Sequence, residues 1–332
     1  MKRISTRHYT PWHYLAPFGL VLITVLSYLP SLHYAFQFDD IANITRYYNI
    51  RHHTFWNLFF TGSRWISYWL NAIHYSIGKF DTLSYRVGNL IIHNLNGLLV
   101  FYLFFTCLNN LKRPSFFKNN SFAIALLSCA LFLLHPVQTQ TVSYVIQGEL
   151  EGMAALFSLG TIACFLNASA AISSGNYCLH LLLMLTLAAF ACGTKEITIV
   201  LPFLLLLIDW FFVAQGSWRE MKKRWWLHAI VFSIITTLYL YLLKPRFFYD
   251  LFGLKMAVKN NIGNIITNNP KSLITPTMFF LSQFKVILHY IGIFIWPFNI
   301  SVEYDWMISR GFFALDCLVP LILLLIIASY TL

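Results

Sequence analysis

Residues 177–215 read YCLHLLLMLTLAAFACGTKEITIVLPFLLLLIDWFFVAQ, two long apolar runs on either side of a short polar turn at Lys195-Glu196. A helix needs about 17 to 25 mostly apolar residues to cross a bilayer, and each run is close to that length. Helices are required there because a segment in lipid must satisfy its own backbone groups. The stretch therefore predicts a transmembrane helical hairpin and, with it, an all-α polytopic membrane protein.

The same pattern recurs along the whole chain. Of the 332 residues, 58% are hydrophobic and only 11% are charged, a composition that excludes an ordinary soluble globular domain. Apolar runs of spanning length predict about nine transmembrane helices. They lie near residues 14–30, 87–108, 121–137, 151–171, 177–194, 197–215, 226–243, 275–296 and 312–332.

The net charge of +11 is spread between spans rather than gathered in one patch, so it does not indicate nucleic acid binding. Three basic groups stand out, namely Lys2, Arg3 and Arg7, then Lys112, Arg113 and Lys118, then Arg219, Lys222, Lys223 and Arg224. One orientation puts all three groups in the cytoplasm, as the positive-inside tendency requires. We therefore expect a multi-pass protein surrounded by membrane lipids, with a cytoplasmic amino terminus.

The first predicted span delivers segment 31–86 to the opposite face, where the adjacent acids Asp39 and Asp40 follow it directly. Paired carboxylates on a loop can supply a general base, ligands for a divalent cation such as Mg²⁺ or Mn²⁺, or both. A plain solvated turn is the alternative. The aromatic-rich stretches 55–60 and 65–70 predict interfacial helices that bring Arg64 and His74 toward the acids.

Two short polar segments fall on the same outer side when spans are counted. His135-Pro136 is expected to end a helix, because proline cannot continue one, and the polar residues from Gln138 to Glu151 are expected to line a wet cavity. Lys195-Glu196 is either an internal ion pair or a place where lysine meets an anion.

Two segments in the last third are less clear. The large outer loop 244–274 is rich in cations, Arg246 among them, which suits either an anionic phosphate or plain solvent. Segment 297–310 falls in the cytoplasm by a simple count. It returns Glu303 and Asp305 to the outer side if 270–296 is instead a re-entrant or horizontal element.

Five blocks spread over about residues 15–306 resemble, by their order and spacing, the C-type (GT-C) membrane O-glycosyltransferases. The similarity is to the branch that contains the transmembrane O-mannosyltransferases acting on cadherins and their bacterial relatives with tetratricopeptide repeats. The blocks are Phe38-Asp39-Asp40, Tyr85 to Asn96, His135-Pro136-Val137-Gln138-Thr139 on to Glu151, Lys195-Glu196 before Pro202, and Phe284-Lys285-Val286 leading to Pro297 and Tyr304-Asp305-Trp306. Arg86 replaces the usual histidine of the bacterial relatives, and Gly148-Glu149 stand where a basic residue is expected.

The resemblance implies an inverting hexosyltransferase of protein glycosylation. Such an enzyme moves a sugar from a polyprenyl-phosphate-linked donor to a hydroxyl of a protein or glycan acceptor, in a cavity facing the periplasm or endoplasmic reticulum lumen. It implies one GT-C-type bundle over 1–332. Because the family usually adds spans and a repeat domain, we expect a short or truncated member, or a separate partner that supplies the carboxy-terminal or repeat part.

The same resemblance assigns roles to individual residues. Asp39 is the expected catalytic base, and Asp40 is the alternative base or the residue that orients the acceptor or a metal ion. The candidate ligands of the donor phosphate are Arg64, Lys195 and Arg246, and the candidate cavity-shaping residues are His93, His135, Gln138, Glu151 and Glu196. A lone histidine such as His93 is also typical of interhelical hydrogen bonding. A lipid or solute transporter and an inactive scaffold with this fold are the competing hypotheses.

Overall fold

The computed structural model describes residues 11–46, 64–111, 115–170, 174–251, 275–301 and 304–331. Within these ranges the regular structure is entirely helical, as the sequence predicts. The chain divides into two compact units, Met1–Pro245 and Arg246–Leu332, which are described separately below.

Five segments among the described residues are long and apolar enough to cross a membrane. They are Thr82–Asn109, Val145–Ala170, Gly175–Cys192, Glu196–Val213 and Thr277–Ile295. Ser121–Leu134 and Pro136–Ser143 form a sixth if the two are counted together across their 47° bend. Three shorter apolar helices, Leu15–Ser31, Trp225–Leu240 and Leu315–Ser329, coincide with three further predicted spans. Several long apolar helices are what a multi-pass membrane protein requires.

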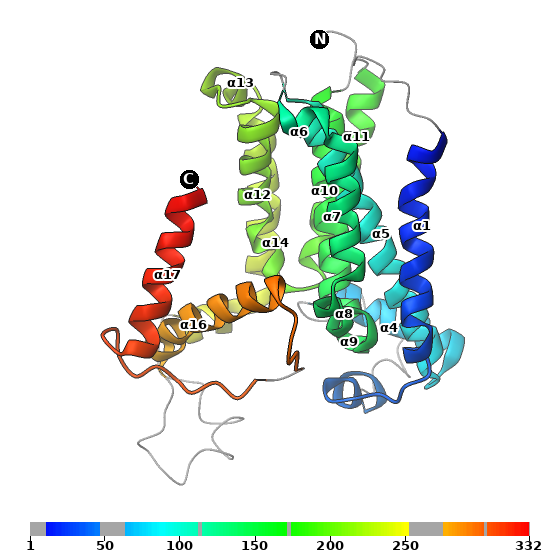
Figure 1. Ribbon diagram of the computed structural model, residues 1–332, viewed down its shortest axis with the longest axis vertical. Coiled ribbons are helices and arrows are strands. Elements are labelled where there is room, and N and C mark those ends of the chain that lie inside the picture. The colour runs from blue at the N-terminus through cyan, green and yellow to red at the C-terminus, as the bar shows by residue number, and fades with distance from the viewer. Residues whose placement is uncertain are drawn as a thin grey trace. The chain divides into compact units, whose positions relative to one another are not determined.

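Two long helices are central to the first unit. Helix α5 (Thr82–Asn109) packs against α7 (Ser121–Leu134) and against α4 (Trp65–Gly78). Helix α10 (Met153–Ala170) packs against α11 (Ser174–Cys192) and α5 (Figure 1). Helix α1 (Pro11–Tyr28) lies along α7 and α5.

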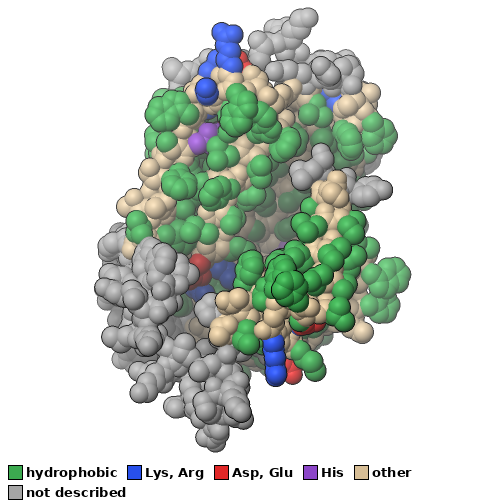
Figure 2. All heavy atoms as spheres, turned by 90° about the vertical axis from the view of Figure 1, so that its left-hand side faces the viewer, with side chains coloured by type: hydrophobic (Ala, Val, Ile, Leu, Met, Phe, Trp, Pro, Cys, Tyr) green, Lys and Arg blue, Asp and Glu red, His purple; other side chains and the backbone are tan. Residues whose placement is uncertain are grey.

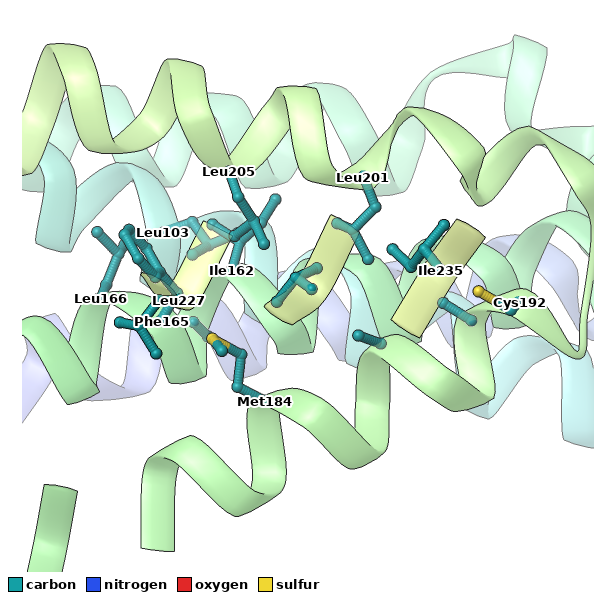
Figure 3. Close-up of a cluster of buried hydrophobic side chains, with 14 of the residues drawn as sticks. Leu103, Ile162, Phe165, Leu166, Met184, Cys192, Leu201, Leu205, Leu227 and Ile235 are labelled. Carbon is teal, nitrogen blue, oxygen red and sulfur yellow. The ribbon is translucent and has the colours of Figure 1, made fainter. Parts of the chain in front are cut away.

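The apolar core of this unit joins α5, α10 and α11 to α12 (Leu201–Ile208) and α14 (Trp225–Leu251). Figure 3 shows the side chains of Leu103, Ile162, Phe165, Leu166, Met184, Cys192, Leu201, Leu205, Leu227 and Ile235 converging from these helices. Because lipid tails are as apolar as leucine, close van der Waals packing rather than water exclusion holds such a cluster together.

The outer faces of the same helices carry large apolar side chains. Leu182, Phe203 and Phe232 are more than half exposed, although each lies on a helix that contributes to the buried core. Hydrophobic side chains cover most of the described surface in Figure 2, and charged ones are few. Helices that are apolar on both faces are expected in a protein that faces lipid.

The first unit has two chemically different ends. At one end lie α6 (Phe116–Asn119) and α13 (Trp218–Lys222) with the basic side chains of Lys118, Arg219 and Lys222 (Figure 1). At the other end lie the 29–46 segment, α4, the broken helix after α7 and the turn after α11, and we call this the Asp39 end. Lys223 and Arg224 directly follow α13, and the other predicted basic residues, 2, 3, 7, 112 and 113, lie outside the described ranges.

The second large loop begins later than the sequence indicates. Helix α14 continues through Pro245 to Leu251 rather than ending near 244, and residues 252–274 lie outside the described ranges. In the second unit, α16 (Pro276–Ile295) packs against α17 (Leu315–Thr331). Helix α16 starts at Pro276 with the Thr275 hydroxyl accepting a hydrogen bond from the Met278 N–H at 3.2 Å, a regular N-cap.

Within the described part of segment 297–310 there is no helix. This connection is tied to α16 where the Ser309 N–H donates to the Ser282 hydroxyl at 2.8 Å. Asp305 is exposed, and Glu303 lies outside the described residues.

Candidate active site

The Asp39 end is built around a break in a helix. Helix α7 stops at Leu134, as the His135-Pro136 pair predicts, because proline has no N–H to continue the helical ladder. The His135 ring nitrogen Nδ1 accepts a hydrogen bond from the Val137 N–H at 3.1 Å and caps the next turn. Four short elements follow, η3 (Pro136–Gln138), α8 (Thr139–Ser143), α9 (Val145–Gln147) and η4 (Gly148–Gly152). Each change of direction leaves carbonyl groups without a helical partner.

A polar stripe on α5 contacts the backbone of these short elements. Asn89 and Asn96 are seven positions apart and therefore on one helical face, together with His93. The Asn89 side-chain amide donates to the Val145 carbonyl at 2.9 Å, and the Asn96 amide donates to the Gly152 carbonyl at 2.9 Å. These buried amide side chains thus tie α5 to backbone carbonyls of α9 and η4.

His93 belongs to the same stripe. Its Nε2 lies 3.1 Å from the Leu133 carbonyl, in the last turn of α7, and its ring stacks on Phe132 at a centroid distance of 5.2 Å. The side chain is 2% exposed. His93 therefore links α5 to α7 through an interhelical hydrogen bond, the role that a lone histidine between helices commonly has.

Arg86 ties the outer segment to the broken helix. Its guanidinium donates to the Ser143 carbonyl at 3.0 Å and to the Ala35 carbonyl at 2.9 Å. It also donates to the carbonyls of Tyr34 and Leu32. A planar group with five N–H donors can serve four carbonyls at once, which neither histidine nor lysine could do. Arg86, which is 2% exposed, therefore holds residues 32–35 against the broken helix.

Asp40 is fully buried and bonded to the backbone. Its Oδ1 accepts from the Ile146 N–H at 2.9 Å, and its Oδ2 accepts from the Gln37 N–H at 3.2 Å. Burial raises the pKa of Asp40, while the hydrogen bonds from Ile146 and Gln37 and the positive charge of Arg86 oppose that rise. Asp40 therefore fixes the loop against the broken helix.

Asp39, its neighbour, is exposed. Phe38, immediately before the two acids, has a left-handed backbone with a φ of 45°. The Asp39 N–H donates to the Tyr144 hydroxyl at 3.0 Å, and its carbonyl accepts from the Asn43 amide at 2.9 Å. The Tyr144 hydroxyl also lies within reach of the Asp39 carboxylate. A solvent-facing carboxylate on a fixed backbone is the result.

The predicted phosphate ligands Arg64 and Lys195 both lie at this end and both meet carboxylates. Arg64 binds Glu196 with Nη2 3.0 Å from Oε2, and Lys195 Nζ lies 2.5 Å from Oε1 of Glu151. Lys195 and Glu196 therefore pair with other residues rather than with each other. The side chain of Arg246 lies outside the described part of the structure.

The remaining predicted side chains occupy the bend. His135 and Gln138 are half-buried in the first turn after the break. Within the described ranges, no group of three or more His, Cys, Asp or Glu residues is arranged to hold a metal ion. Both Asp40 oxygens already accept backbone hydrogen bonds, so a cation bound by the acid pair would depend mainly on Asp39.

Helix α4 adds a buried polar face that the sequence interpretation did not single out. Ser67, Asn71 and His74 follow one another at helical spacing and are all buried. The Ser67 hydroxyl donates to the Glu149 carbonyl at 2.7 Å, and Asn71 lies beside the fully buried Glu149 carboxylate. The helical spacing of these three polar residues, in a helix that is otherwise mostly aromatic and aliphatic, was the available signal.

The side chain of His74 contacts helix α5. Its ring packs against Tyr85 at a centroid distance of 5.3 Å and lies directly over Gly88 of α5. Burial lowers the pKa of His74 to about 4, so the ring is neutral at physiological pH. A neutral, packed ring holds α4 on α5. The first predicted interfacial helix, at 55–60, lies outside the described residues.

Comparisons of the chain with profiles of protein families, with curated proteins and with solved structures give no significant match.

Proposed function

We propose that the protein is an inverting glycosyltransferase that moves a sugar from a polyprenyl-phosphate-linked donor to a hydroxyl acceptor on a protein or glycan. The observation that carries the proposal is the separation of the acid pair, with Asp40 buried and backbone-bonded and Asp39 exposed beside Tyr144. Asp40 holds the loop in place, and Asp39 remains available to accept a proton.

In the proposed reaction the Asp39 carboxylate removes the proton of the acceptor hydroxyl as the hydroxyl oxygen attacks the anomeric carbon. The bond between that carbon and the phosphate oxygen breaks, and the electron pair leaves with the polyprenyl phosphate. Single displacement inverts the anomeric centre. A base fixed in position and a stabilised leaving group are the two contributions that such a step needs from a protein.

The role proposed for the cations is to stabilise the leaving polyprenyl phosphate. Lys195 and Arg64 come from the turn after α11 and from the start of α4, and both lie at the Asp39 end of the first unit. Arginine and lysine suit a phosphate because each donates several charged hydrogen bonds. With the basic groups of Lys118, Arg219 and Lys222 in the cytoplasm, the Asp39 end faces the periplasm or organelle lumen.

The test is turnover of the purified protein with a panel of polyprenyl-phosphate sugars, followed as loss of sugar from the lipid. We expect Asp39→Asn to lower turnover by at least about 100-fold, the contribution typical of a general base. Glu220→Gln is the matched control, because it removes an exposed acid paired with Lys223 at the opposite end. Full activity of Asp39→Asn would remove the proposed base.

The same assay separates the competing functions. Binding of the lipid without turnover by any donor would favour an inactive scaffold. Movement of an unmodified polyprenyl-phosphate sugar across a vesicle membrane, with no sugar released, would favour a transporter. Either result contradicts the proposal.

A further inference from the structure

Four charged side chains at the Asp39 end form two neighbouring ion pairs. Arg64 meets Glu196 and Lys195 meets Glu151, and the adjacent residues Lys195 and Glu196 bring the two pairs to one turn. The pairs are open to solvent, with 38% of both the Arg64 and Glu196 side chains and 45% of the Glu151 side chain exposed. The cations proposed to receive a phosphate are thus already neutralised by carboxylates.

These carboxylates are not what holds the turn in place. The Ile66 N–H donates to the Gly193 carbonyl at 2.9 Å, which fixes the start of α4 on the turn. Trp65 packs so closely over Gly193 that a Cβ there would lie 2.7 Å from the indole ring. Arg64 and Glu196 are therefore brought together by their backbones, whether or not they form a pair.

Lys195 is held in the same way. Its carbonyl accepts hydrogen bonds from the Thr198 hydroxyl at 2.9 Å and from the Tyr239 hydroxyl at 3.1 Å. Tyr239, on α14, is 3% exposed, so this anchor belongs to the core of the unit. Partly exposed ion pairs contribute little to folding stability. The position of the turn therefore does not depend on Glu151 and Glu196.

We infer that the carboxylates of Glu151 and Glu196 compete with the phosphate of the lipid for Arg64 and Lys195. This regulation rests on the proposed function. The carboxylates occupy Lys195 and Arg64 until a polyprenyl phosphate displaces them, and they re-form the pairs when it leaves. Transfer of the sugar converts the donor's phosphodiester into a phosphomonoester, which carries more negative charge and binds the cations more tightly. The competitors then speed product release, a step that often limits turnover.

Binding of polyprenyl phosphate, the reaction product, to the purified protein in nanodiscs of neutral lipid tests this inference. The variants are Glu151→Gln, Glu196→Gln and both together, with Glu220→Gln as the control for loss of an exposed ion pair elsewhere. We expect the double variant to bind polyprenyl phosphate about ten-fold more tightly than the unchanged protein and the control, and high salt to reduce the difference. Thermal unfolding midpoints that match those of the unchanged protein show that the variants fold.

Two further ligands identify the group that is recognised. Polyprenol, which lacks the phosphate, should bind all variants alike, and tightening for polyprenol would overturn the competition. Binding of inorganic phosphate shows whether the site recognises polyprenyl phosphate in particular or any phosphate group. Tightening for the lipid alone assigns the site to polyprenyl phosphate, and equal tightening for both assigns it to any phosphate.

Lys195→Gln and Arg64→Gln separate this inference from the proposed function. If both variants lose affinity while the glutamate variants gain none, only the competition is overturned. If neither variant changes the affinity, the phosphate site itself is elsewhere, and both proposals about these cations fail. In multiple-turnover assays the double glutamine variant should be slower than the unchanged protein, although its first turnover should be at least as fast.

Discussion

The Asp40 carboxylate accepts a hydrogen bond from the backbone N–H of Ile146 at 2.9 Å, across 106 positions of the chain. This contact joins the loop after α1 to the broken helix after α7. Because Asp40 is buried and Asp39 is exposed, one loop carries a structural acid and an accessible acid side by side.

Asp40→Asn should destabilise the protein more than Asp39→Asn. The asparagine amide would place an N–H₂ group against one of the two backbone N–H donors, and a buried unsatisfied donor costs about 1–3 kcal/mol. Asp39→Asn alters an exposed side chain and should leave stability within about 0.5 kcal/mol. Thermal unfolding of the two variants in detergent measures the difference, and equal midpoints would contradict this division of roles.

Arg86→Lys should be strongly destabilising although it keeps the charge. A lysine has one ammonium group and cannot span the carbonyls of Ser143 and Ala35, so buried backbone acceptors lose their partners. Each buried acceptor that is left unsatisfied costs about 1–3 kcal/mol. Arg224→Lys gives the comparison, because Arg224 is bonded to a carboxylate rather than to backbone carbonyls and is more exposed. A native midpoint for Arg86→Lys would show that the four carbonyl contacts do not matter.

Stability should fall in mildly acidic solution because of His74. Its pKa is lowered by burial to about 4, whereas an unfolded histidine has a pKa near 6.5. As the pH falls, the unfolded chain therefore binds the proton before the folded protein does. The contribution of His74 to the free energy of unfolding is complete above about pH 6.5 and is lost as the pH falls toward 4. The lost stability is at most about 3 kcal/mol. In His74→Gln the pH dependence over this window should be flatter, and an unchanged slope would assign it to other groups.

Gly148→Ala and Gly88→Ala should both loosen the Asp39 end. A methyl group on Gly148 would overlap the side-chain amide of Asn89, and one on Gly88 would overlap the His74 ring. Such overpacking typically costs about 1–3 kcal/mol. Gly292→Ala on α16 is the control, because nothing lies within 4 Å of its added Cβ and alanine favours the helix. Unfolding midpoints that fall for the first two variants but not for the third would support the close packing.

Asp209→Asn should destabilise the opposite end of the first unit. The buried Asp209 carboxylate meets the Arg224 guanidinium at 2.6 Å and His228 Nε2 at 2.8 Å, joining the end of α12 to the start of α14. Removal of one buried charge leaves its partners unpaired, at a cost of about 3–5 kcal/mol. Lipid binding at the Asp39 end should be unchanged. Loss of lipid binding in a folded Asp209→Asn protein would show that the two ends are coupled.

The sequence predicts the Asp39 end in part. Proline in His135-Pro136 ends α7 by a purely local effect, and the polar residues after it could not face lipid, so the break was visible without coordinates. The sequence also brought Lys195 and Arg64 to the same end by the parity of the spans. It could not pair them with Glu151 and Glu196, because pairing depends on how the turn after α11 meets the start of α4.

Some parts of the interpretation depended on contacts that no local pattern encodes. Asp39 and Asp40 look equivalent in the sequence, and only the left-handed backbone at Phe38 and the N–H of Ile146 separate them. The packing of His74 on α5 also depends on a contact between two helices, because Gly88 leaves room for its ring there.

The sequence by itself determined the all-α architecture and the positions of most apolar helices, because the need to satisfy backbone groups in lipid acts on each segment separately. Tertiary structure decided which polar side chains are buried in hydrogen bonds to the backbone and which remain accessible to solvent. That distinction arises where Arg86, Asn89 and Asp40 meet backbone groups distant in the chain, since a hydrogen-bond partner is fixed only when the helices pack.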